Sequence, residues 1–460
     1  MANEDGLLFF NASNPSRFRD KDIQRAIRKR VMRDIGKARR KIKRPPAMTF
    51  VWQTSNVTPP SIPERPAPSL TCYPLPVDMD SRALELIHFM NAEAEYNFRP
   101  FRKIWFSMAL QDESAFLLCK ANAAMFLEET RYPHTFRYEK CQETLTYYGQ
   151  CVRQVTDRLS DPIENTGMGV IICILGLICH DLYVGTLDRW AYHIQGLAEI
   201  IQIRGGYWQL DENIQLFCSW FDVLGSVTRD TPPKISSYPI TLDILDAPMK
   251  STSKHLQFEL LLGELQVSPL NMPHFVMVLQ KARVLADFVN KRYDEDGFWK
   301  AEDDISPLRA LTPITHDLLL LPQVVQLAVE EDQIAVEMTR LALLILLSGL
   351  KAKYGFSSAE MPTLHTKLSR LVHQASIFHT NIVVRRLQLW ALVIGALFQP
   401  TEPVRSQFVE GIISLMISLD LTGGAAVLNY IRDTIWIEII ERNATEQLIH
   451  DINTFDSFNT

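Results

Sequence analysis

The chain has 460 residues, 47% of them hydrophobic and 22% charged, with a formal net charge of −6. Such a chain can bury a large core and corresponds to one large or two to three smaller domains. The apolar stretches 341–350 and 389–398 are shorter than the ~20 residues of a membrane span, and no apolar run follows the acidic start, so we expect neither a membrane segment nor a secretion signal. Seven cysteines, all in the first half, predict reduced thiols in the cytosol or nucleus rather than disulfides.

The charge is distributed unevenly along the chain. Residues 17–44 hold 14 Lys and Arg against 3 Asp, a local charge of +11, and subtracting this from −6 leaves −17 on the remaining residues. Within the segment Ile23, Ile27, Val31 and Ile35 recur four residues apart, with cations on the other faces. The pattern predicts a basic amphipathic helix, which Gly36 weakens near its middle.

A basic helix of this kind has three functional interpretations besides a solvated helix that binds nothing. It can be a nuclear import signal centred on residues 39–44, an arm that contacts DNA phosphates, or a helix that binds a protein partner. We favour import, because the segment offers no base-reading fold. The residues predicted to act in import or DNA contact are Arg28, Lys29, Arg30, Arg33, Lys37, Arg39, Arg40, Lys41, Lys43 and Arg44.

A proline-rich segment separates this basic N-terminal arm, residues 1–44, from the rest of the chain. Residues 45–80 contain nine prolines. Proline lacks a backbone N–H and disfavours both helices and strands in its vicinity. The composition therefore predicts an extended linker over 45–80.

From residue 81 to 460 the apolar residues recur with the period of a helix, and period-two alternation is scarce. Asp80 and Asp112 are expected to cap helices. The pattern predicts an all-α body over 81–460 without a fixed repeat, and proline-rich residues 230–254 look like a connector at which the body could divide. Helical patterns in the second half fall at 255–265, 273–292, 325–354, 364–379, 380–398, 404–420 and 425–450.

The clearest local signal is at residues 174–206, which predict two helices and a tight turn. Residues 169–179 are almost wholly apolar, so their helix is expected to be buried on all sides. Gly185 breaks the pattern. A second, amphipathic helix then runs until Gly205 and Gly206 provide a left-handed stop.

The same region holds the residues that most resemble a chemical site. Cys173, Cys179 and His180 are close in sequence, but the two cysteines fall on different sides of a helix and no CxxC pair occurs, which predicts buried thiols and no metal site. His180 and Asp181, with His193, could form an acid–base unit. Their position at a helix junction favours capping instead: His180 on the last carbonyls of its helix, and Asp181 or Asp188 at the start of the next.

Other candidate residues are weaker. The run Glu302-Asp303-Asp304 resembles half of the carboxylate cluster of α-helical prenyl-diphosphate enzymes, but a single run before Pro307 predicts a solvated loop. The motifs GxxxxGK[ST], GxGxxG and GxSxG are absent. We predict that surface positions hold His365, His373, His379, Arg370, Arg385 and Arg386. Core positions are predicted for Trp190, Trp208, Trp220, Trp390 and Trp436. No catalytic residue, metal or cofactor is expected.

Three stretches carry a family resemblance. They are FFNASNPSRFRDKDIQRAIRKRVMRDIGKARRKIK at 9–43, CHDLYVGTLDRWAYHIQGLAEIIQIRGG at 179–206 and VLNYIRDTIWIEIIER at 427–442. They resemble the fungal-specific transcription factor-like proteins, whose all-helical body is the regulatory region behind a binuclear zinc cluster. The first stretch is similar to the N-terminal arm of members without that cluster, and the second to the central helix pair.

Full activators of this kind hold two zinc ions with six closely spaced cysteines that place a helix at the major groove, and no such array occurs in this sequence. The resemblance implies a multi-helix regulatory domain in a non-enzymatic, nuclear transcription regulator, of the kind that acts on a secondary-metabolite gene cluster. Its expected partners are proteins of the transcription machinery or a DNA-binding regulator, with a small effector or direct DNA contact as alternatives and the oligomeric state left open. An all-α enzyme of prenyl-diphosphate type and a non-regulatory interaction scaffold are the rival hypotheses.

Overall fold

The computed structural model describes residues 79–92, 102–237, 255–268, 272–299, 304–323, 331–356, 358–374, 381–398, 404–438 and 442–459. All of them belong to one compact unit, residues 73–460. The predicted basic arm and residues 45–78 of the predicted linker lie outside the described residues. Their boundaries and structure therefore stay predictions.

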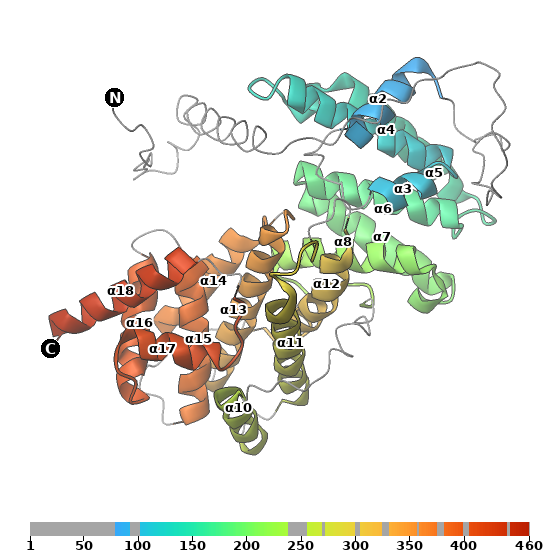
Figure 1. Ribbon diagram of the computed structural model, residues 1–460. Coiled ribbons are helices and arrows are strands. Elements are labelled where there is room, and N and C mark those ends of the chain that lie inside the picture. The colour runs from blue at the N-terminus through green and yellow to red at the C-terminus, as the bar shows by residue number, and fades with distance from the viewer. Residues whose placement is uncertain are drawn as a thin grey trace, which may run out of the picture. The chain divides into compact units, whose positions relative to one another are not determined.

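The described part of the chain is all-α, as predicted: it contains α-helices, two short 3₁₀ helices and no strand (Figure 1). The first group of helices is α2 (Ser81–Ala92), α3 (Arg102–Ala109), α4 (Glu113–Arg131), η3 (Tyr138–Lys140), α5 (Gln142–Ser160), α6 (Met168–Val184), α7 (Leu187–Ile203), η4 (Tyr207–Gln209) and α8 (Glu212–Arg229). The second group is α10 (Leu256–Val267), α11 (Pro273–Arg292), α12 (Ser306–Leu319), α13 (Glu331–Lys353), α14 (Met361–Gln374), α15 (Ile382–Phe398), α16 (Val404–Ser418), α17 (Gly423–Arg432) and α18 (Arg442–Asn459).

Helices α4 and α6 form the centre of the first group, where α4 packs against α2, α3, α5 and α6. Both predicted caps are confirmed: Asp80 Oδ1 accepts the N–H of Ala83 (2.6 Å), and Asp112 Oδ1 accepts the N–H of Ser114 (3.0 Å). A side-chain acceptor at this position satisfies an N–H that has no partner within the helix. Each cap therefore fixes where its helix begins.

Helix α6 is the buried helix predicted from its apolar run. Every residue from Val170 to Asp181 is buried. Gly176 allows α3 and α4 to approach, because a Cβ there would lie 2.7 Å from Leu118 Cδ1 and 2.8 Å from Trp105 Cζ2. Gly185 ends the helix in the left-handed conformation, with φ of 81°.

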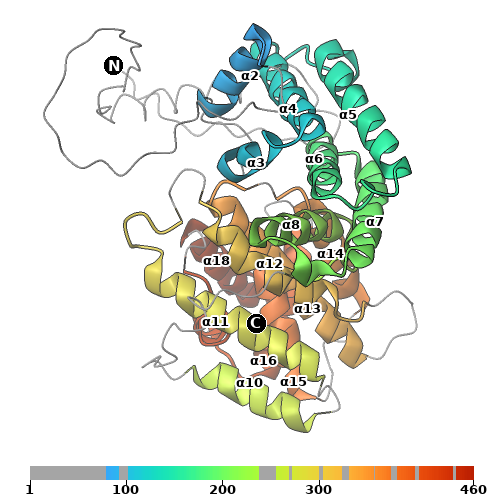
Figure 2. The same ribbon diagram turned by 90° about the vertical axis from the view of Figure 1, so that its right-hand side faces the viewer.

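Helices α13 and α15 form the centre of the second group. They pack along each other, and α13 also contacts α12 and α14 while α15 contacts α16 (Figure 2). Among the described residues, the stretch Asp332–Lys353 is long and apolar enough to cross a membrane, and α16 with α17 passes the same test only as a pair bent by 86°. Because 94% of the Asp332–Lys353 window is buried inside the structure, α13 is the core helix of this group.

Helix α8 contributes to the cores of both groups. Phe217, Trp220 and Phe221 belong to the core formed with α3 to α7. Val223 and Val227, less than two turns later, belong to the core of α10 to α18. The two groups thus meet on one continuous helix that lies before the predicted connector 230–254, of which residues 238–254 are outside the described part.

Two features of the second half differ from the sequence predictions. Helix α12 was not among the predicted helices, since a solvated loop was expected before Pro307. Pro307 instead occupies the first turn of α12, where its missing N–H costs nothing. The single helix predicted over 425–450 is two helices, α17 and α18, interrupted by a non-helical segment at 433–438. That segment has structural roles, described below, that helical spacing alone could not show.

Candidate functional site

The ten basic residues predicted for import or DNA contact, Arg28 to Arg44, all lie outside the described residues. The prediction for the basic arm therefore rests on its sequence. Within the described residues, the polar groups of the two motif stretches and a pocket beside α8 are the candidate sites.

His180 lies fully buried near the C-terminal end of α6. Its Nδ1 is 2.6 Å from Asn122 Oδ1 on α4, and its Nε2 is 2.9 Å from the hydroxyl of Tyr138 in η3. Since an amide oxygen only accepts, Nδ1 carries the proton and Nε2 accepts from the tyrosine. Burial lowers the pKa of His180 to about 4, so the ring is neutral near pH 7. The predicted capping role for His180 is wrong: the ring joins α6 to α4 and η3.

Asp181 is also fully buried, and it binds side chains of α7 rather than capping that helix. Its Oδ1 is 2.9 Å from Arg189 Nη2, and its Oδ2 is 2.8 Å from His193 Nδ1. The position before α7 is Thr186, which makes no side-chain cap bond. A buried carboxylate requires such partners, because leaving it unpaired is very costly. Asp181 therefore links α6 to α7 through both Arg189 and His193.

Trp190 anchors α7 on α8. Its Nε1 donates to the carbonyl of Phe221 at 3.0 Å, and the side chain is 3% exposed. The ring lies directly over Gly225, where a Cβ would be 2.5 Å from Cδ2 and closer still to two other ring atoms. The Trp-x-x-His pattern of the second motif stretch thus places two contacts one turn apart, one to α8 and one to α6.

The third motif stretch contains the non-helical segment 433–438, which connects three helices. Asp433 Oδ2 accepts a backbone N–H in the first turn of α10 at 2.8 Å. A carbonyl of the segment accepts from Trp390 Nε1 of α15 at 2.9 Å. Asn290 of α11 donates to the carbonyl of Trp436 at 2.7 Å. The Asp-Thr-Ile-Trp sequence therefore serves to hold α10, α11 and α15 together.

A buried ionic network joins the end of α8 to α13 and α14. Arg340 is fully buried and donates to both carboxylate oxygens of Asp230, at 2.8 and 2.9 Å, and to Glu337 at 2.7 Å. Lys367 Nζ lies 2.7 Å from Asp230 Oδ2. Asp230 has a left-handed backbone, with φ of 51°. Two positive and two negative groups balance one another, as burial of charge requires.

Asp222 is a buried carboxylate on α8 that holds the start of the connector. Its Oδ2 accepts the backbone N–H groups of Lys234 and Ile235, each at 2.6 Å. Burial raises the pKa of Asp222 to about 6, although these hydrogen bonds act in the opposite direction. The carboxylate is therefore poised to titrate just below neutral pH.

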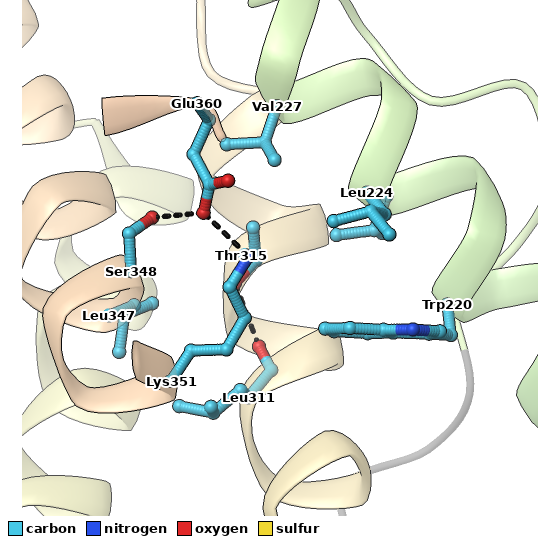
Figure 3. Close-up of a pocket in the computed structure, with 10 residues that line it drawn as sticks. Trp220, Leu224, Val227, Leu311, Thr315, Leu347, Ser348, Lys351 and Glu360 are labelled. Atoms are coloured by element: carbon cyan, nitrogen blue, oxygen red, sulfur yellow. Dashed lines mark hydrogen bonds and ion pairs between the residues drawn. The ribbon is translucent and has the colours of Figure 1, made fainter. Parts of the chain in front are cut away.

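A pocket lies where α8, α12 and α13 meet the start of α14 (Figure 3). Its polar end is formed by Glu360, whose Oε1 accepts from Ser348 Oγ and from Lys351 Nζ, both at 2.6 Å. The Lys351 ammonium also lies 5.7 Å from the centre of the Trp220 ring. The lining residues are Trp220, Val223, Leu224, Val227, Leu311, Thr315, Leu347, Ser348, Lys351 and Glu360.

Other residues singled out in the sequence have structural places. Among the described residues no cluster of His, Cys, Asp and Glu could hold a metal ion, and Cys173 and Cys179 are buried free thiols. Asp304 Oδ1 accepts the N–H of Ser306, at the first residue of α12 (2.8 Å), whereas residues 302–303 lie outside the described part.

Three side chains that the sequence assigned to the surface or the core have a defined exposure in the structure. His365 is 7% exposed rather than at the surface, and burial lowers its pKa to about 4. His373 is exposed as predicted. Trp208 is 62% exposed, in contrast to its predicted core position. Trp208 lies in the short η4 turn after Gly206, in which Tyr207 is the buried residue.

The charged residues of the buried network and of the pocket were not predicted from the sequence. Glu337 and Arg340 interrupt the apolar run of α13 three residues apart, a spacing that signals an internal ion pair. Asp222 stands between apolar neighbours on α8. Glu360 and Lys351 carry no such signal, because they lie in and beside a polar turn.

The fold and these contacts define an all-helical domain whose buried charged groups, in the networks described, hold helices together. The family model "Fungal specific transcription factor domain" matches residues 87–423. The chain therefore belongs to the fungal-specific transcription factor domain family, and its role is that of a transcription regulator. No curated protein and no solved structure matches the chain.

Proposed function

We propose that this protein is a nuclear transcription regulator whose helical domain binds protein partners or a small effector, and whose basic arm directs nuclear import. The observation that carries the proposal is the +11 charge of residues 17–44 in a chain whose family domain, residues 87–423, regulates transcription. Stretches of five to eight residues rich in Lys and Arg are typical of import signals and of nucleic-acid-binding patches. Residues 39–44 supply five cations in six positions.

We infer that the protein acts through partners rather than through cysteines that form a zinc cluster and contact DNA. The sequence holds seven cysteines, and those in the described part are buried free thiols. Burial raises the pKa of the Cys119, Cys179 and Cys218 thiols, which favours the protonated form over the thiolate that binds zinc. Partners are proteins of the transcription machinery or a DNA-binding regulator, and the controlled genes are those of a secondary-metabolite cluster, as the family resemblance implies.

The import step is tested by fusing the full chain to a fluorescent protein in fungal cells. Replacing Arg39, Arg40, Lys41, Lys43 and Arg44 together by Ala is expected to shift the fluorescence from the nucleus to the cytoplasm. A control variant with Ala at Arg17, Arg19 and Lys21 removes three positive charges from the same arm outside residues 39–44 and is expected to remain nuclear. Unchanged nuclear fluorescence in the first variant would show that import does not depend on residues 39–44.

A further inference from the structure

Glu360 presents a buried, unused hydrogen-bond acceptor to the pocket beside α8. The side chain is 1% exposed, and Oε1 already accepts from Ser348 and Lys351. Oε2 is buried and has no hydrogen-bond partner among the residues that the structure describes. Figure 3 shows this oxygen turned from the Ser348 side toward Val227 and Leu224. A buried acceptor without a donor is unfavourable, so the site favours a molecule that brings one.

The charge of the site determines which functional group the bound molecule presents to Glu360. The Lys351 ammonium is 2.6 Å from Glu360 and occupies the face of Trp220, so the carboxylate is already neutralised by a cation inside the protein. A second cation would have to displace Lys351, and an anion would meet Glu360. A neutral hydrogen-bond donor, such as a hydroxyl group, satisfies Oε2 and leaves the buried ion pair intact.

The apolar walls of the pocket determine the rest of the bound molecule. Beside the polar end they are Trp220, Val223, Leu224, Val227, Leu311 and Leu347, from α8, α12 and α13. The enclosed space that can hold the centre of a water is about 20 Å³, and the hollow including its open mouth is about 280 Å³. The first is enough for one water, and the second includes space that is open to solvent.

We propose that this pocket is an effector site for a small neutral molecule with a hydroxyl group on an apolar skeleton of about one ring. The hydroxyl donates to Glu360 Oε2, and the ring lies on Leu224, Val227 and Trp220. This inference rests on the proposed role as a regulator that responds to an effector. The pocket is suited to that role because α8, which forms one wall, contributes to the cores of both helix groups.

Phenol and toluene form a matched pair of probes, since they have almost the same size and differ in the hydroxyl group. Isothermal titration of the full chain is expected to show phenol binding at millimolar or lower concentration, and toluene at least about tenfold weaker, because toluene leaves Oε2 without a donor. Equal affinities would show that the buried oxygen plays no part. Absence of phenol binding would overturn the proposal altogether.

The location is tested by Leu224→Phe, which fills the mouth of the pocket and is expected to abolish phenol binding. The control Leu260→Phe changes the same residue type at a half-exposed position on α10 and is expected to bind phenol like the wild type. Unchanged affinity in a folded Leu224→Phe variant would place phenol elsewhere. If that variant does not fold, the wild-type comparison of phenol with toluene still decides. Binding is measured without any gene readout, so its outcome is separate from that of the regulator proposal.

Discussion

The contact between Trp190 and Gly225 yields a sharp prediction for the packing of α7 on α8. Ala at position 225 would gain ~1 kcal/mol of helix propensity over Gly. Its methyl group, however, would overlap the Trp190 ring, at 2.5 Å from Cδ2 and closer to Cε2 and Cζ2. The ring cannot withdraw without lengthening the 3.0 Å bond from Nε1 to the Phe221 carbonyl, a bond worth about 1 kcal/mol.

Overpacking of this kind costs roughly 1–3 kcal/mol, and weakening of the hydrogen bond offsets the propensity gain, so Gly225→Ala is expected to lower stability by about 2 kcal/mol. Gly196→Ala is the matched control, because a Cβ at this position of α7 meets nothing within 4 Å. That variant is expected to be more stable than the wild type by ~0.5–1 kcal/mol. Urea unfolding followed by far-ultraviolet circular dichroism measures both changes. Equal stabilisation of the two variants would refute the packing described for Trp190.

Three further predictions concern the buried carboxylates and their partners. Burial raises the pKa of Asp222 from 3.8 to about 6 in the folded state, so the contribution of Asp222 to stability is full well below pH ~4 and is lost as the pH rises through 6. Asp222→Asn is expected to remove a decrease in stability of about 2–3 kcal/mol between pH 4 and 7, measured as urea midpoints across that range. Arg340→Met leaves buried carboxylates poorly compensated and is expected to cost about 3–5 kcal/mol, whereas Lys367→Met, at a 37% exposed side chain, costs much less; similar losses in thermal unfolding would contradict the network. Asp433→Ala removes the side-chain acceptor at the start of α10 and is expected to cost about 1 kcal/mol, with faster amide hydrogen exchange confined to the first turn of α10.

The sequence allowed the helices to be predicted wherever apolar periodicity and a cap coincide. Helix α6 follows from its apolar run, and α4 from the Asp112 cap, because both signals are local. Helix α12 was missed, since Pro313 within it suggests a break that packing in the core overrides. Periodicity therefore gives the helices, but it does not show where proline is tolerated.

The partners of the polar groups could not be predicted in the same way. His180 binds Asn122, which is 58 residues earlier, and Asp433 binds the start of α10, 176 residues earlier. Such pairs are formed by the packing of helices, which one sequence does not specify. Local reasoning assigned both His180 and Asp181 to capping because the junction was visible and the neighbouring helices were not.

The central claim, that the protein regulates transcription from the nucleus, is tested most directly by transcript profiling of a deletion strain complemented with defined variants. Deletion is expected to change a coordinated set of genes, which the wild-type chain restores. The variant with Ala at Arg39, Arg40, Lys41, Lys43 and Arg44 is expected not to restore them unless a separate import signal is attached. A transcript profile that deletion leaves unchanged would contradict the claim.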